Sequence, residues 1–199
     1  MRITVPTILT LLRIGMIPIF VLCFYLPASW SNIAATVVFG MAAVTDWLDG
    51  YLARRLRETS AFGAFLDPVA DKLMVATALV LLVDINPTPY PGAFLAIAAA
   101  VIIGREITIS ALREWMAELG ANAKVAVSYV GKVKTTAQMV ALLLLLYREP
   151  VYGFSAATAG FWLLYLAAGL TLWSMLHYLK TAWPDLIGTG HEHSSSRQY

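Results

Sequence analysis

Six long apolar segments, separated by short polar connections, are the feature that most limits what this chain can fold into. A helix of about 20 mainly apolar residues crosses the hydrocarbon core of a bilayer. Six segments come close to this length, and packed into one soluble domain they would leave large apolar surfaces in water. The pattern therefore predicts an all-α polytopic membrane protein with six transmembrane helices. The segments cover residues 14–26, 31–48, 62–83, 91–109, 127–147 and 154–179.

The composition supports a membrane protein. Hydrophobic residues make up 59% of the 199 residues, and the mean hydropathy is +0.71, whereas a soluble domain is usually about 45–50% apolar. We expect one membrane domain over residues 1–186, in which an amphipathic lead-in helix from Pro6 precedes the first span, and a disordered polar tail over 187–199. Cys23 is the one cysteine, so the chain has no disulfide framework.

The basic residues fall almost entirely on one side of the predicted membrane. If the chain crosses six times, its two ends and its second and fourth connections share a side. Thirteen of the fourteen lysines and arginines belong to that side, and Arg148 alone belongs to the other. Because cytoplasmic loops are enriched in lysine and arginine, we expect both termini and the connection within 45–71 to face the cytoplasm.

Four aspartates flank the second connection, in the stretch TDWLDGYLARRLRETSAFGAFLDPVAD at 45–71. Residues three, four and seven apart share one face of a helix, so each flanking helix carries a stripe of carboxylates and small residues. The connection is short, so we expect antiparallel neighbouring helices whose carboxylates converge. The small residues leave room for a ligand to approach the backbone. The stripes are Asp46, Asp49, Gly50 and Ala53 on the first helix and Gly63, Asp67 and Asp71 on the second.

Carboxylates gathered near a membrane repel one another and require a compensating cation. Arg54, Arg55 and Lys72 supply part of it, but the inward stripes hold no cation apart from Lys72. Hard divalent ions such as Mg²⁺ or Mn²⁺ prefer oxygen ligands, and four carboxylates suit a site for two ions that act on a phosphoryl group. We therefore predict a two-metal centre held by Asp46, Asp49, Asp67 and Asp71.

The same stretch reads DWLDGYLAR at 46–54, eight further residues, and GAFLDPVAD at 63–71. It fills every fixed position of the pattern D-x-x-D-G-x-x-A-R-x8-G-x-x-x-D-x-x-x-D, and on these residues the chain resembles the CDP-alcohol phosphatidyltransferase family. The likeness continues in VPTILTLLRIGMIP at 5–18, GREITISALREWMAELG at 104–120 and VGKVKTTAQMVALLLLL at 130–146.

The resemblance implies an enzyme of the bacterial cytoplasmic membrane, commonly a homodimer, with its active site in a polar cavity open to the cytoplasm. Such enzymes use an alcohol to displace CMP from a CDP-linked lipid, here CDP-diacylglycerol, with two divalent ions. By motif position Asp71 would also be the base that deprotonates the acceptor hydroxyl. No nucleic-acid partner is expected. The residues implied at the CDP group are Asp49, Gly50, Ala53, Arg54 and Gly63.

A second cluster of charges points to the acceptor. Arg105 follows a long uncharged stretch and precedes further apolar residues, and an ionisable residue inside a membrane is a candidate for function. An ion pair with Glu106 or Glu114, or an interfacial position, is the alternative explanation. Clustered cations suit a phosphate monoester, and sn-glycerol 3-phosphate is the acceptor that the resemblance indicates. The predicted acceptor residues are Arg105, Arg113, Lys132 and Lys134.

Three other functions remain open at this point. The first is a transferase of the same family that uses another alcohol, such as serine or inositol. The second is a membrane prenyltransferase, which also binds a diphosphate through Mg²⁺ and paired aspartate motifs. The third is a divalent-cation transporter with an acidic site. The leaving group, the accepted alcohol and any metal flux distinguish them.

Overall fold

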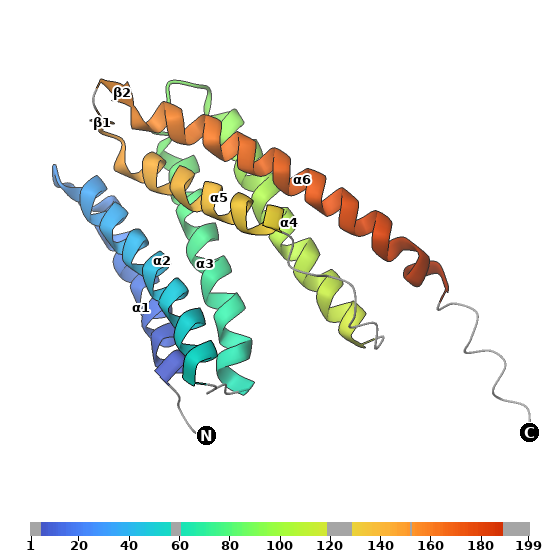
Figure 1. Ribbon diagram of the computed structural model, residues 1–199. Helices are drawn as coiled ribbons and strands as arrows, with labels where there is room; N and C mark the ends of the chain where they lie inside the picture. Colours follow the sequence, from blue (N-terminus) through green and yellow to red (C-terminus); the bar gives the residue numbers. More distant parts are fainter. Residues whose placement is uncertain (1–4, 57–60, 119–128, 152, 189–199) are drawn as a thin grey trace, which may run out of the picture.

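The computed structural model describes residues 5–56, 61–118, 129–151 and 153–188 (Figure 1). Within them the chain forms six helices and one short hairpin whose two strands have two residues each. The prediction of an all-α protein is confirmed. The hairpin joins β1 (Pro150–Val151) to β2 (Phe154–Ser155). The helices are α1 (Val5–Tyr25), α2 (Ser31–Leu56), α3 (Ala61–Ile85), α4 (Gly92–Glu118), α5 (Tyr129–Tyr147) and α6 (Ala156–Gly188).

The six helices differ in how well they suit a bilayer. By length and composition, four have described stretches that can cross one: Thr7–Tyr25, Ser31–Leu52, Gly92–Leu112 and Ala156–Leu176. Helix α5 is apolar over the shorter stretch Val133–Tyr147. Helix α3 has 25 residues but also carries three aspartates and a lysine. The chain is a polytopic helical membrane protein, and the count of six spans stays a prediction.

The predicted lead-in is not a separate helix. Helix α1 runs without a break from Val5, and its apolar stretch begins at Thr7, before the predicted start of the first span. This stretch contains Arg13, which is 1% exposed. Because its charge is directed into the protein, the span tolerates an arginine that would be costly against lipid. At the other end of the chain, α6 reaches Gly188, and the tail beyond it lies outside the described residues.

The helices alternate in direction, so the bundle has two distinct ends. Helix α1 packs against α2 and α3, and α6 packs against α4 and most extensively against α5 (Figure 1). The connections α1–α2, α3–α4 and α5–α6 meet at the upper end in Figure 1. At that end Asn32 joins α2 to the start of the α5–α6 connection by donating to the Tyr147 carbonyl at 2.8 Å and to Glu149 at 3.2 Å.

Most buried polar side chains lie in the half of the bundle away from the apolar core, and Asn32 and Thr88, near the upper end, are exceptions. The apolar core lies in the half that leads to the upper end, where large side chains from all six helices are buried, and many apolar side chains outside it face outward. The core includes Phe20, Phe39, Leu82, Leu95, Leu145 and Leu164. The other half buries polar groups, which a membrane protein keeps away from lipid. They include Thr7, Thr10, Arg13, Arg105, Lys134, Gln138 and Thr171.

Helices α5 and α6 are tightly packed at Gly160. A Cβ atom there would lie 2.9 Å from the Ala141 carbonyl oxygen, 2.9 Å from Leu145 Cγ and 3.0 Å from Leu144 Cβ. We expect Gly160→Ala to lower the free energy of unfolding by about 1–3 kcal/mol, the usual cost of overpacking, measured by thermal unfolding in detergent. Gly169→Ala on the same helix is the control, because nothing lies within 4 Å of that position. Equal melting temperatures for the two variants would contradict this packing.

Candidate active site

Arg13 joins two of the four aspartates. Its Nη1 atom lies 2.8 Å from Asp46 Oδ1 on α2 and donates a hydrogen bond of 3.2 Å to Asp67 Oδ1 on α3. The guanidinium is almost fully buried, whereas the two aspartates remain partly exposed. Two carboxylate oxygens from different helices therefore lie within 3.2 Å of one nitrogen atom.

The packing of α1 explains how the carboxylates converge. Helices α2 and α3 run antiparallel, as predicted, but they contact each other little, and α1 packs against both. Thr7, Thr10 and Arg13 are spaced three apart on α1 and all are buried, so one polar face of α1 is directed at its neighbours. The expectation that Lys72 alone could place a cation among the aspartates is wrong, because Arg13 comes from a third helix.

Asp71 belongs to the same centre. A small pocket beside the ion pair is lined by Arg13 and Asp46, by Asp71 one helical turn beyond Asp67, and by apolar side chains of α2, α3 and α5. Asp71 also lies within electrostatic range of Asp46, Asp67 and Glu106. The structure thus brings three of the four predicted metal ligands to one place, where a single cationic group already lies between two of them.

By donor type, these carboxylates suit a hard divalent ion. The donors are carboxylate oxygens, the ligand type that Mg²⁺ and Mn²⁺ prefer, and a positive charge is already bound between Asp46 and Asp67. Among the described residues, no three His, Cys, Asp or Glu side chains are close enough together to share one metal ion. The Asp49 side chain, which the sequence places on this face of α2, lies outside the described side chains.

The residues predicted to contact the CDP group are only partly described. Gly50 on α2 and Gly63 on α3 are half-buried, on the two helices that supply the aspartates. Ala53 and Arg54 lie in the last turn of α2, and their side chains are outside the described set. The predicted nucleotide contacts therefore stay a prediction.

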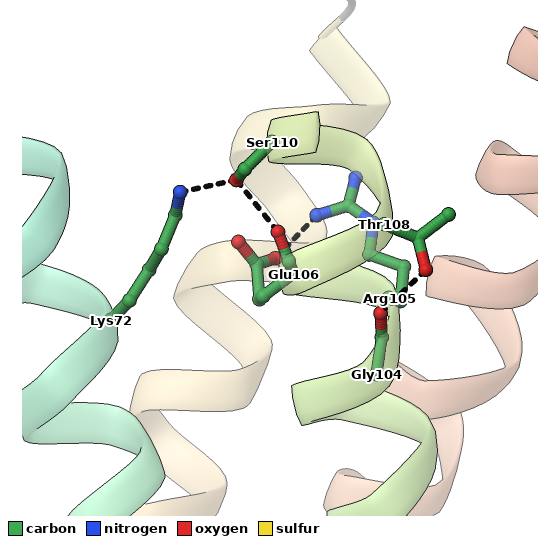
Figure 2. A network of polar contacts seen from close by, with 6 residues as sticks. All are labelled: Lys72, Gly104, Arg105, Glu106, Thr108 and Ser110. Atoms are coloured by element: carbon green, nitrogen blue, oxygen red, sulfur yellow. Dashed lines mark hydrogen bonds and ion pairs between the residues drawn. The ribbon is translucent and has the colours of Figure 1, made fainter. Parts of the chain in front are cut away.

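Figure 2 shows how α3 is connected to α4. Lys72, next to Asp71 on α3, extends to α4 and donates a hydrogen bond to the Ser110 hydroxyl. That hydroxyl donates in turn to the Glu106 backbone carbonyl at 2.7 Å. The Glu106 carboxylate forms an ion pair with Arg105 Nη1. Lys72 is thus directed toward α4 in this arrangement.

The predicted acceptor residues have different surroundings. Arg105 is 7% exposed and Lys134 is 6% exposed, on α4 and α5, which both pack against α6. Arg105 forms an ion pair with Glu106, which is one of the two internal partners that the sequence offers. The Arg105 Nε atom is nevertheless buried with no hydrogen-bond partner in the described part of the chain. The side chains of Arg113 and Lys132 lie outside the described set.

The geometry can be compared with known families. The model of the CDP-alcohol phosphatidyltransferase family matches residues 3–173, which run from the first helix into the last and include all the residues of the aspartate centre. The chain belongs to this family. The resemblance to this family that the sequence motifs indicate is therefore confirmed, and the protein is a phosphatidyltransferase.

Bacterial members of the CDP-alcohol phosphatidyltransferase family are similar along nearly the whole chain. The Escherichia coli K12 protein named CDP-diacylglycerol–glycerol-3-phosphate 3-phosphatidyltransferase is 56% identical over 187 residues, which cover 94% of this chain and 99% of that protein. Proteins of the same name from Shigella sonnei and Shigella flexneri are 56% and 55% identical over the same lengths. Neither a prenyltransferase nor a cation transporter is favoured.

Arg13 lies at the aspartate centre, but the sequence motifs do not predict it there. In the sequence it stands only among the thirteen basic residues of the predicted cytoplasmic side. The signal was present, since Arg13 stands within an apolar segment just as Arg105 does, and such a residue is a candidate for function. What the sequence did not give was its partner, because Asp67 is 54 positions away.

Proposed function

We propose that the protein transfers the phosphatidyl group of CDP-diacylglycerol to sn-glycerol 3-phosphate, which yields phosphatidylglycerol phosphate and CMP. The observation that carries this proposal is the 56% identity, over 94% of the chain, to a relative named for this reaction. The aspartate centre agrees with it, because transfer from a pyrophosphate needs concentrated positive charge around the phosphoryl oxygens.

We propose Asp46, Asp49, Asp67 and Asp71 as the ligands of two divalent ions, Mg²⁺ or Mn²⁺. Enzymes of the family generally depend on divalent metal. Held by these aspartates, such ions would neutralise the phosphoryl oxygens and stabilise the leaving CMP. The convergence of Asp46 and Asp67 on Arg13 supports this assignment, since the two carboxylates already share one cation.

Asp71 is the proposed base. It lines the pocket beside Asp46 and lies one helical turn beyond Asp67, so its carboxylate can accept a proton from a hydroxyl group held in that pocket. The acceptor hydroxyl gives its proton to Asp71, and its oxygen replaces CMP on the lipid phosphorus. Gly50, Ala53, Arg54 and Gly63, with Asp49, are the proposed contacts to the CDP group.

The acceptor phosphate is assigned to the basic residues of α4 and α5. Arg105 and Lys134 are buried cations, and Arg113 and Lys132 stand on the same helices. A charge-assisted hydrogen bond to phosphate is stronger than a neutral one. Glu106 holds Arg105 through Nη1, and the Arg105 Nε remains as a donor for a ligand.

Arg105→Gln should raise the KM for glycerol 3-phosphate by about 10- to 100-fold, the equivalent of about 1.5–3 kcal/mol for a bond to a charged group. The KM for CDP-diacylglycerol should change little. Arg148→Gln is the control, since this half-buried arginine follows α5 at the opposite end of the bundle. Equal increases in both KM values would contradict the acceptor assignment.

We also infer an inner-membrane protein with both termini and the active site in the cytoplasm, acting as a homodimer. The distribution of basic residues supports this orientation. The alternating helix directions agree with it, because α1 begins, α2 ends and α3 begins at the same end of the bundle (Figure 1).

The test of the proposed function is CMP release by the purified protein in detergent with CDP-diacylglycerol, Mg²⁺ and one acceptor at a time. Glycerol 3-phosphate should support turnover, while glycerol, serine and inositol should not. Turnover with serine or inositol alone would assign the protein to another branch of the family. Diphosphate as the released product would contradict the phosphatidyl transfer itself.

A further inference from the structure

Arg13 lies outside the family signature and has no assigned role. Its guanidinium is buried, and one nitrogen atom, Nη1, contacts a carboxylate oxygen on each of the two helices that carry the aspartates. Helix α1 packs against both of those helices, which contact each other little. Arg13 thus contacts both the Asp46 and the Asp67 side chains.

The same oxygens are the proposed metal ligands. A divalent ion binds carboxylate oxygen at about 2.0–2.1 Å when it is Mg²⁺, whereas Arg13 Nη1 lies 2.8 Å from Asp46 Oδ1 and 3.2 Å from Asp67 Oδ1. A guanidinium and a dication cannot both lie between these oxygens, because they occupy the same space and repel each other. Figure 2 shows Lys72 directed to Ser110, so Lys72 does not take the place of Arg13 there.

We propose that Arg13 is a positioning residue that competes with the divalent ions for Asp46 and Asp67. It holds the two carboxylates together and balances their charge, and it leaves their oxygens when a dication binds. The adjacent pocket, lined by Arg13, Asp71, Met74 and Met139 among others, borders the guanidinium. The inference rests on the proposed metal role of these aspartates.

Binding of Mn²⁺ to the purified full-length protein in detergent, followed by electron paramagnetic resonance, tests this competition without measuring turnover. Arg13→Gln should tighten Mn²⁺ binding by about tenfold or more. A neighbouring cation weakens the binding of a proton to a carboxylate by about 1–3 pK units, and we expect it to weaken the binding of a metal cation at least as much. Arg13→Lys keeps the charge and should stay close to the wild type. Arg148→Gln, with its arginine at the opposite end of the bundle, should also leave the affinity unchanged.

Thermal unfolding provides a second readout that depends on charge rather than on packing. Without added metal, Arg13→Gln should melt at a lower temperature than the wild type, and saturating Mn²⁺ should remove most of that difference. The double variant Arg13→Gln with Asp46→Asn removes one charge of each sign and should recover part of the lost melting temperature. If Arg13→Gln does not fold, failure of the double variant to restore folding overturns the proposal.

The outcomes separate this inference from the function on which it rests. Wild-type protein that binds no Mn²⁺ would overturn the metal centre and the competition together. Wild-type protein that binds Mn²⁺, with equal or weaker binding by Arg13→Gln, would overturn the competition alone. Tighter binding by Arg13→Gln together with near-normal binding by Arg13→Lys would support it.

Discussion

Replacing Asp71 with asparagine should reduce CMP release by about 10²–10⁴-fold, the range that a general base contributes. Asparagine keeps the shape of the side chain but neither accepts the acceptor proton nor carries the charge that a metal requires. Asp71 is the described aspartate that shares the pocket with both Asp46 and Arg13. Steady-state CMP release at saturating acceptor concentration measures the change in kcat.

A matched control exists on the same helix. Asp84 lies near the other end of α3, where its carboxylate accepts a hydrogen bond of 2.7 Å from Tyr25. Asp84→Asn should leave kcat within about threefold of the wild type, because a group that does not touch the reacting atoms is usually worth little beyond its local contact. Residual turnover by Asp71→Asn above about one-tenth of the wild-type rate would remove Asp71 as the base.

Removing divalent metal should have the second large effect. Metal ions at a phosphoryl centre supply several kcal/mol of stabilisation, so a chelator should lower CMP release by roughly a thousandfold or more. Added Mg²⁺ or Mn²⁺ should restore the rate. The measurement is CMP release by the same preparation before chelation, after chelation and after readdition of metal.

Variants of the aspartates test whether the metal acts at these carboxylates. Asp46→Asn and Asp67→Asn should both raise the Mg²⁺ concentration needed for half-maximal rate, because each removes the negative charge of a carboxylate that contacts Arg13. Asp84→Asn should not. Full turnover in the presence of the chelator would mean that these carboxylates serve another purpose.

The sequence was sufficient for the parts of the site that depend on local order. Helical phase placed Asp46 and Asp49 on one face of a helix, and Asp67 and Asp71 on one face of the next, and the structure brings Asp46, Asp67 and Asp71 to one centre. The all-α membrane fold also followed from the sequence, since apolar segments long enough to span a bilayer leave few alternatives. Both features are local in the chain.

The remaining parts depend on tertiary packing. Helix α1 packs against α2 and α3 and supplies Arg13, and neither fact follows from helical phase within the signature. The sequence offers both Glu106 and Glu114 as ion-pair partners of Arg105, and the structure shows the pair with Glu106. The β1–β2 hairpin was missed because its strands have two residues each, too few to give an alternating pattern.

Product analysis tests the central claim most directly. Purified protein would be incubated with CDP-diacylglycerol, Mg²⁺ and radiolabelled sn-glycerol 3-phosphate, and CMP and labelled lipid would be measured together. The proposed reaction predicts equal amounts of both products, and neither product when the acceptor or the metal is omitted. CMP release that continues without the acceptor, or with no label in the lipid, would contradict phosphatidyl transfer to glycerol 3-phosphate.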